Sequence, residues 1–358
     1  MNSQVKSYKP ITSKRNPGQF SVLLVWLTLF FVAGFYHPLV FAQEAVVLVG
    51  SGSSVPAPLY IKWAQEYNKR NPAIQMRYVP LGTSEGIKQI AQGSGDFGAG
   101  EAQLTAAERK EGNLIELPAV LIGIVPIYNL PGVHAELRFS GELLADIFLG
   151  QVKTWNAPQI AKLNPNVSLP NLPIRVIYRP AGKGSNYVFS EFLSKTSSTF
   201  REQIGTSASP KWPVGAPAER SADMADKVKN EAGSIGYVEA QYAVQARIPN
   251  GLVQNAAGKY VKASPETIKA ACRAVEAPAW DKFSASLSNA PGADAFPITS
   301  FTWLYLRTTS TDPRRAAALV NLLNWMFTDG QRLASEDGYA ELPQQLVANV
   351  KTKVSSLH

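Results

Sequence analysis

The sequence has very few of the residues that build disulfides and metal sites. It holds one cysteine and three histidines in 358 residues. Cys272 alone closes no disulfide within the chain, and its helix-like surroundings favour a buried, inert thiol over a nucleophile. His37, His134 and His358 are scattered along the chain. We therefore predict no metal site and no cofactor.

Charged residues are also scarce, at 17% of the chain, whereas 45% of the residues are hydrophobic. This composition excludes disorder as the default and suits a compact protein long enough for two domains. The formal net charge of +8 is not gathered into a Lys/Arg stripe with interleaved aromatic residues. Because nucleic acid binding requires such a stripe, we do not expect it.

Residues 1–42 are predicted to be a cleavable signal peptide. Basic residues precede an apolar run, residues 20–35, and small residues at 40–42 form a cleavage site after Ala42. The alternative is that this segment stays as a membrane anchor, since the basic region is long. Cleavage removes four positive charges and no negative ones, which leaves a net charge of about +4. No other stretch is long and apolar enough to span a bilayer.

The rest of the chain alternates short β-rich runs with helical patterns, which predicts an α/β fold. Expected strands are 45–50, 74–81, 96–101, 173–179, 233–240 and 295–307, and the apolar run 117–130 is expected to be extended because Pro and Gly interrupt it. Expected helices begin near 57, 83, 140, 157, 184 and 221, and the last strong helix begins at Asp312-Pro313.

The spacing of apolar residues predicts which faces of these helices are buried. The expected buried residues are Leu59, Tyr60, Trp63, Ala64 and Tyr67 in the first helix, Ile87, Ile90 and Ala91 in the second, Val188, Phe189, Phe192 and Leu193 in the helix after 184, and Leu319, Val320, Leu323, Met326 and Phe327 in the last.

Three predicted strand-to-helix junctions consist of small polar residues: 51–54, 82–84 and 182–186. The first N–H groups of a helix have no partner within it, and the helix dipole adds positive charge there. Because glycine and serine leave these amides accessible, such loops are able to bind an anion. The alternative for each junction is a simple N-cap. Three junctions in one chain, with Arg179 beside the third, favour an anion site.

Known nucleotide loops do not fit these junctions. Residues 50–55 lack the third glycine of a dinucleotide fingerprint, and residues 182–185 lack the upstream glycine of a P-loop. A rival enzymatic hypothesis rests on residues 82–86, which match the G-x-S-x-G pattern with Ser84 as nucleophile. A serine hydrolase also needs a histidine near the serine, and only His134 and His358 remain after the leader.

Eight segments occur in this order along the chain: GSGSSVPAPLYIKWAQEY, GTSEGIKQI, DFGAGEAQL, IFLGQVKTWNAPQIAKLNP, VIYRPAGKGSNYVFSEFL, KWPVG, GSIGYVEAQYA and FPITSFTWLYL. Together they resemble the periplasmic phosphate-binding proteins of ABC phosphate importers. The resemblance implies a two-lobed α/β fold with a hinge and a central cleft that holds dehydrated phosphate. The implied lobes are 43–123 with 299–358, and 124–298.

The resemblance also implies ligand-binding residues, some of them altered here. The first loop places a hydroxyl on Ser54 and a main-chain N–H on Val55, where the family usually has an aromatic residue. The second loop places a hydroxyl on Thr83. The family's buried aspartate, which accepts the proton of hydrogen phosphate, falls on Glu101.

The third loop departs further from the family. Its arginine falls on Arg179, and its serine, glycine and threonine fall on Lys183, Gly184 and Ser185. Ala181 stands where the family has an acidic residue that steadies the arginine. The site is therefore expected to be more positive, and it holds phosphate or a related anion. The alternative is that Lys183 points to solvent and Glu101 only bonds loop amides.

By this resemblance the protein is not an enzyme. It is expected to be a periplasmic monomer that captures inorganic phosphate and delivers it to ABC transporter permease subunits, with lobe closure around the ligand. The alternative within the same fold is a sensor or scavenger of phosphate, arsenate or a related oxyanion, without a role in transport.

Overall fold

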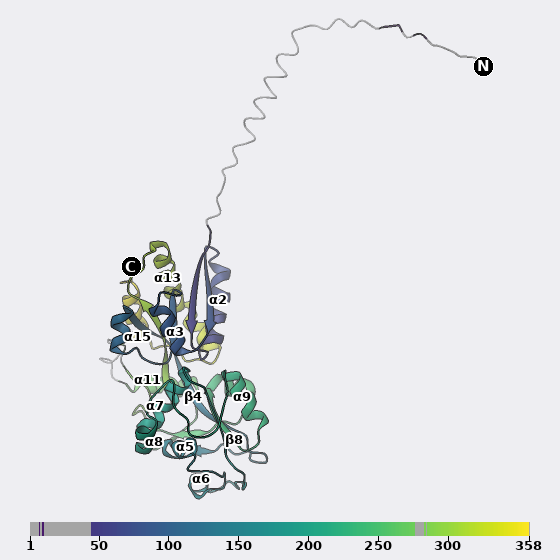
Figure 1. The fold of residues 1–358 in the computed structure, drawn as a ribbon, viewed down its shortest axis with the longest axis vertical. Coiled ribbons are helices and arrows are strands. Elements are labelled where there is room, and N and C mark those ends of the chain that lie inside the picture. Colours follow the sequence, from purple (N-terminus) through teal and green to yellow (C-terminus); the bar gives the residue numbers. More distant parts are fainter. Residues whose placement is uncertain (1–6, 8, 11–43, 276–282, 284, 358) are drawn as a thin grey trace, which may run out of the picture. The chain divides into compact units, whose positions relative to one another are not determined.

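A mixed sheet of eight strands, in the order β2-β1-β3-β11-β4-β8-β6-β7, organises the part of the chain that the computed structural model describes. The described residues are 44–275, 283 and 285–357, together with 7, 9 and 10. Residues from Ala45 onward form one unit (Figure 1). Apart from residues 7, 9 and 10, the predicted signal peptide lies outside the described residues.

The strands confirm the predicted β-rich runs. They are β1 (Val46–Gly52), β2 (Ile74–Pro80), β3 (Phe97–Gly100), β4 (Leu114–Tyr128), β5 (Arg138–Phe139), β6 (Arg175–Tyr178), β7 (Ala216–Pro217), β8 (Ser234–Glu239), β9 (Leu252–Gln254), β10 (Tyr260–Val261) and β11 (Thr299–Arg307). Strand β1 is parallel to β2 and β3, whereas β11 is antiparallel to β3 and β4. Strands β5, β9 and β10 form a separate small sheet.

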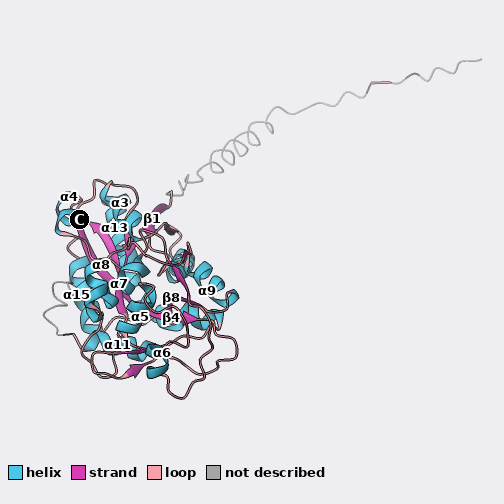
Figure 2. Ribbon diagram, turned by 60° about the horizontal axis from the view of Figure 1, so that its bottom comes forward, coloured by secondary structure: helices cyan, strands magenta, loops and turns pink. Residues whose placement is uncertain are grey.

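Helices follow most of the strands. They are α2 (Ala57–Arg70), α3 (Thr83–Ala91), α4 (Ala106–Glu111), α5 (Gly141–Phe148), α6 (Pro158–Leu163), α7 (Gly184–Thr196), α8 (Ser198–Gln203), α9 (Ser221–Asn230), α10 (Ala240–Ala246), α11 (Pro265–Arg273), α13 (Pro313–Met326), α14 (Asp329–Glu336) and α15 (Gln344–Val354). Helices α2, α3 and α13 pack against β1–β3, and α7, α9 and α10 pack against β4 and β8 (Figures 1 and 2).

Strand β4 is the apolar run that the sequence predicts to be extended. All its residues except Ile115 are buried. It pairs with β11 as far as Gly123, and with β8 from Ile124 onward. Because one continuous strand has two different partners along its length, it connects the β1–β3 group to the β8–β6 group.

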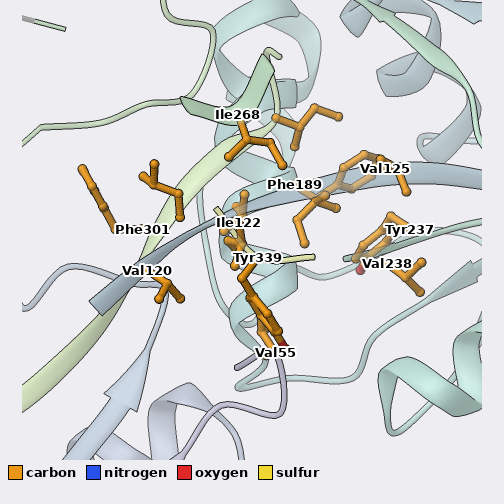
Figure 3. Packing of buried hydrophobic residues seen from close by; sticks show 14 of the residues in the cluster. Val55, Val120, Ile122, Val125, Phe189, Tyr237, Val238, Ile268, Phe301 and Tyr339 are labelled. Carbon is orange, nitrogen blue, oxygen red and sulfur yellow. The ribbon is translucent and has the colours of Figure 1, made fainter. Parts of the chain in front are cut away.

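The core confirms most of the predicted helix faces. The expected residues of α2 and α7 are all buried. Figure 3 shows Val120, Ile122 and Val125 of β4 packed among side chains from both ends of the chain. One of these is Tyr339, whose hydroxyl donates a hydrogen bond to the carbonyl oxygen of Val55, at 3.0 Å. Cys272 is fully buried as predicted, and burial raises the pKa of its thiol to about 12.

Two details of the predicted helix faces are wrong. Ala91 is exposed because it is the last residue of α3, where the helix leaves the sheet. Leu319 and Val320 are only half-buried, although both pack against the core. Two further helices, α14 and α15, follow the last strong helix that the sequence predicts. They were not predicted, and each buries only three or four residues.

In the described part of the chain, no helix is both long and apolar enough to cross a membrane. The same residues contain no group of three or more His, Cys, Asp or Glu side chains arranged to hold a metal ion.

Candidate anion site

All three predicted junctions lie between a strand and a helix. Helix α2 begins at Ala57 after the 51–56 loop, α3 begins at Thr83, and α7 begins at Gly184. Gly82, the residue before α3, has φ +112°, a conformation that favours glycine. Each junction therefore presents the first N–H groups of a helix, as the sequence predicts.

The second and third junctions touch each other. The main-chain N–H of Ser84 donates a hydrogen bond to the carbonyl oxygen of Gly182, at 3.3 Å. A Cβ atom at Gly82 would lie 3.0 Å from that same oxygen. Glycine is thus needed at position 82 for both its φ angle and this close approach, and the contact brings the start of α3 next to the start of α7.

Glu101 lies where these two helix starts meet. The Thr83 hydroxyl donates to Glu101 Oε2, at 3.0 Å, and a Cβ atom at Gly184 would lie only 1.4 Å from this oxygen. Its other oxygen, Oε1, has no hydrogen-bond partner among the described residues. Glu101 is 1% exposed. A buried carboxylate oxygen without a donor is an acceptor for a proton carried by a ligand.

Burial raises the pKa of Glu101 to about 8. The hydroxyl groups of Ser53 and Thr83 lower the pKa, the negative charge of Glu239 raises it, and Arg179 lowers it. Between pH 4.5 and pH 8, the folded protein therefore holds a proton on Glu101 that the unfolded chain has released. Stability should fall as pH rises through this window, because the unfolded state then binds fewer protons than the folded state.

We expect Glu101→Gln to remove this loss of stability. Glutamine has nearly the same size and carries no charge at any pH, so the variant should lose less stability than the wild type between pH 5 and pH 9. The measurement is the urea midpoint of the ligand-free protein at both pH values. Equal losses in the two proteins would show that Glu101 does not titrate in this window.

Arg179 connects the third junction to the first. It is 1% exposed, and its Nη2 donates to Ser54 Oγ at 3.2 Å and to the carbonyl oxygen of Glu219 at 2.8 Å. Its Nη1 donates to Ser221 Oγ at 2.9 Å. Ser54 and Arg179 are 125 positions apart in the sequence. The guanidinium thus lies beside the first loop, as the anion-site hypothesis requires.

Asn186 fixes the shape of the third loop. Its Nδ2 donates to the carbonyl oxygens of Arg179, Pro180 and Ala208, and its Oδ1 accepts from the Tyr237 hydroxyl. The main-chain N–H of Arg179 donates to the same tyrosine oxygen, at 3.1 Å. From the sequence, Asn186 was predicted only as the last residue of the junction. Its position just before the apolar residues Val188 and Phe189 could have indicated that its amide side chain is buried and hydrogen-bonded.

The remaining predicted site residues have different surroundings. Ser185 Oγ is buried and has no hydrogen-bond partner among the described residues. The Val55 N–H donates to Ser53 Oγ at 3.1 Å, so this amide is already used within its loop. Lys183 Nζ lies 3.4 Å from Glu219 Oε2, and its side chain is 19% exposed. The lysine therefore forms an ion pair at the edge of the site rather than pointing freely to solvent.

Comparison with known proteins identifies the family. A family model described as "PBP superfamily domain" matches residues 40–330. The phosphate-binding protein PstS of Pasteurella multocida is 35% identical to this chain, over 87% of the chain and 92% of the relative. PstS of Haemophilus influenzae is also 35% identical, over 87% and 93%. This chain belongs to the PstS family of phosphate-binding proteins.

Solved structures share the fold of this PstS-family chain. A DING protein superposes with a TM-score of 0.68 at 15% identity, covering 85% of this chain and 93% of the other. A phosphate ABC transporter substrate-binding protein with bound phosphate, from Clostridium perfringens, gives 0.61 at 16% identity, covering 83% and 100%. The two-lobed α/β fold expected from the sequence is thus confirmed.

Among the residues that the structure describes, no histidine is found beside Ser84, as the hydrolase hypothesis would require. His134 lies in a pocket with residues such as Tyr128, Glu136 and Arg247, and Ser84 does not line it. His358 lies outside the described residues. The PstS relatives are named phosphate-binding proteins, which agrees with the prediction that this chain binds an anion and catalyses no reaction.

Proposed function

We propose that this protein captures inorganic phosphate and delivers it to an ABC importer. The observation that carries the proposal is a set of contacts between separate parts of the chain. Arg179 bonds to Ser54, Glu101 lies against Thr83 and Gly184, and the charge of Arg179 acts on Glu101. The relatives at 35% identity are named phosphate-binding proteins, which supports phosphate as the anion.

In this proposal each site residue has a role. Hydroxyl groups of Ser54, Thr83 and Ser185 and the main-chain N–H groups of Val55 and Gly184 donate hydrogen bonds to phosphate. Arg179 supplies charge, with Lys183 adding to the positive potential at the edge. Glu101 accepts the proton of hydrogen phosphate. The buried, unpartnered Ser185 Oγ and Glu101 Oε1 support these assignments.

The number of donors is sufficient for tight binding. A micromolar site needs about 8 kcal/mol, and each hydrogen bond to a charged group contributes roughly 1.5–3 kcal/mol. Five to eight such bonds, a rough count for a closed anion site, supply this after the entropy cost of binding. The Val55 N–H must leave Ser53 Oγ, or share it, before it can donate to phosphate.

The proposed lobes are 43–123 with 299–358, and 124–298. The change of β4 partner between Gly123 and Ile124 supports the first boundary. The start of β11 at Thr299 supports the second. Phosphate would then lie between the lobes, with Ser54, Thr83 and Glu101 from one, and Arg179 and Gly184 from the other. Closure around the ligand would present a surface to the permease.

The proposed location is the periplasm, after removal of residues 1–42, where the protein would act as a monomer and meet the ABC permease subunits. The signal-like sequence and the family support this location. The expected cleavage after Ala42 is checked by N-terminal sequencing of the exported protein.

Calorimetry of the chain that begins at residue 43 tests the ligand directly. We expect one phosphate per chain, bound at micromolar concentration or tighter, with sulfate bound at least tenfold more weakly. Above pH 8, where Glu101 is ionised, sulfate carries no proton for it to accept, so the contact between two acceptors is unfavourable. Arsenate, which carries a proton, should bind in competition with phosphate. Clear heat with another anion and none with phosphate would overturn the assignment.

A further inference from the structure

The buried Arg179 guanidinium has only neutral hydrogen-bond acceptors among the described residues. These are the hydroxyl oxygens of Ser221 and Ser54 and the carbonyl oxygen of Glu219. Its Nε has no partner there. An arginine side chain is always charged in proteins, and a buried charge without a counterion is strongly unfavourable. A negative group in the surroundings is therefore expected to balance the charge of Arg179.

Glu239, the last residue of β8, is a buried carboxylate to which the sequence analysis assigns no role. It is 0% exposed, and neither of its oxygens has a hydrogen-bond partner among the described residues. Burial raises its pKa, and Arg179 is the largest influence that lowers the pKa again. Tyr237, two residues earlier and on the same face of β8, accepts from the main-chain N–H of Arg179 at 3.1 Å, so this face of the strand is turned toward Arg179. A buried carboxylate without a hydrogen-bond partner on that face points to a pair with the guanidinium.

Ser221, the first residue of α9, lies between the two groups. Its Oγ accepts from Arg179 Nη1, at 2.9 Å, which leaves its hydrogen for another acceptor. The Ser221 side chain also lowers the pKa of Glu239, although the two side chains form no hydrogen bond in this structure. A hydroxyl that accepts from the arginine and donates to the glutamate would fix the orientation of both side chains.

We propose that Glu239 is the counterion of Arg179 and, through the Ser221 hydroxyl, positions the guanidinium beside Ser54. Glu101, the other buried carboxylate nearby, already accepts from Thr83 and lies against Gly184. Glu239 thus acts on the anion site through Arg179 without touching the ligand. It carries the negative charge that position 181, an exposed alanine, does not supply.

This assignment gives the two buried carboxyl groups of the site different charges, with Glu239 ionised and Glu101 protonated. With Glu239 ionised beside Arg179, the second buried carboxylate, Glu101, has no cation left to itself and holds its proton more tightly. The other titratable groups that interact electrostatically with Glu101 or Glu239 are tyrosines whose pKa is raised by burial: Tyr60, Tyr78, Tyr237, Tyr242, Tyr305 and Tyr339. Glu191 and Tyr187 line a small pocket together with Glu101.

A double-mutant cycle tests the pair without phosphate. Arg179→Gln and Glu239→Gln each leave one buried charge unbalanced, so each should lower the urea midpoint of the protein at pH 7. The double variant removes both charges, and its midpoint should be no lower than that of the less stable single variant. If a single variant does not fold but the double variant does, this result also supports the pairing. Additive losses would overturn the pairing.

Glu116→Gln is the matched control. Glu116 is also buried, but it accepts hydrogen bonds from Arg109 and from the Leu104 N–H. The loss of stability in Glu116→Gln should therefore add to the loss in Arg179→Gln, with no coupling energy between the two substitutions. The outcome of the cycle is independent of the proposed function. A chain that fails to bind phosphate can still contain this pair, and a chain that binds phosphate can lack it.

A spectroscopic measurement distinguishes an ionised Glu239 from a neutral Glu239 that only fills space in the core. The Glu101 carboxyl carbon, followed by ¹³C NMR between pH 5 and pH 10, should titrate at lower pH in Glu239→Gln than in the wild type. The reason is that the negative charge of Glu239 raises the pKa of Glu101 and Arg179 lowers it. An unchanged Glu101 titration would show that Glu239 carries no charge and would overturn the proposal.

Discussion

Replacing Arg179 with alanine should weaken phosphate binding at least tenfold and by as much as a hundredfold. The Arg179 guanidinium donates a hydrogen bond to Ser54 and is proposed to donate to phosphate as well. Hydrogen bonds from a charged donor contribute roughly 1.5–3 kcal/mol each to the binding free energy. The loss should appear in the dissociation constant measured by calorimetry at neutral pH. Arg179→Lys should be intermediate, because lysine keeps the charge but cannot reach Ser54 and Ser221 together.

Arg175→Ala provides the control for this prediction. Arg175 is exposed and lies four positions earlier, at the start of β6. Its removal subtracts the same charge from the chain and should change phosphate affinity less than threefold. If Arg179→Ala folds and binds phosphate within threefold of the wild type, the guanidinium does not contact the ligand.

Replacing Gly184 with alanine should have a comparably large effect. The backbone of Gly184 is helical, so alanine suits its conformation. A Cβ atom there would nevertheless lie 1.4 Å from Glu101 Oε2 and 2.5 Å from Thr83 Oγ1. The methyl group must displace the carboxylate or the start of α7, and both form the site. We expect at least tenfold weaker phosphate binding and a lower urea midpoint.

A second substitution tests the cause of that loss. Shortening the obstructing side chain, in Gly184→Ala combined with Glu101→Ala, should recover part of the lost stability. Gly292→Ala is the control, because a Cβ atom there meets the Cβ atoms of Ala274 and Ala295 rather than the site. Full stability and affinity in Gly184→Ala would mean that Glu101 lies elsewhere in the ligand-free protein.

The α/β class and the positions of the three junctions were predictable from local sequence, whereas the two-lobed arrangement was implied only by the family resemblance. Alternating apolar patterns fix strands and helices, and Ser or Gly between them marks an accessible helix start. The 117–130 run was read correctly as extended because Pro and Gly exclude a long helix. Helices α14 and α15 were not predicted, and part of the buried face of α14 consists of Gly330 and Gln331, which are not apolar.

The parts of the site that sequence reasoning missed depend on tertiary contacts. Asn186 and Ser221 stabilise the loop and Arg179 through hydrogen bonds to residues far along the chain, which no local pattern records. Glu239 is the last residue of a buried strand, where a side chain could equally have faced solvent. The use of the Val55 N–H by Ser53 is likewise visible only in three dimensions.

The most direct test of the account is a crystal structure of the chain grown with phosphate. The account predicts a single phosphate within hydrogen-bond distance of Ser54, Thr83, Arg179 and the start of α7, with Glu101 facing one phosphate oxygen. Phosphate bound at another place, with these side chains still bonded to one another, would contradict it.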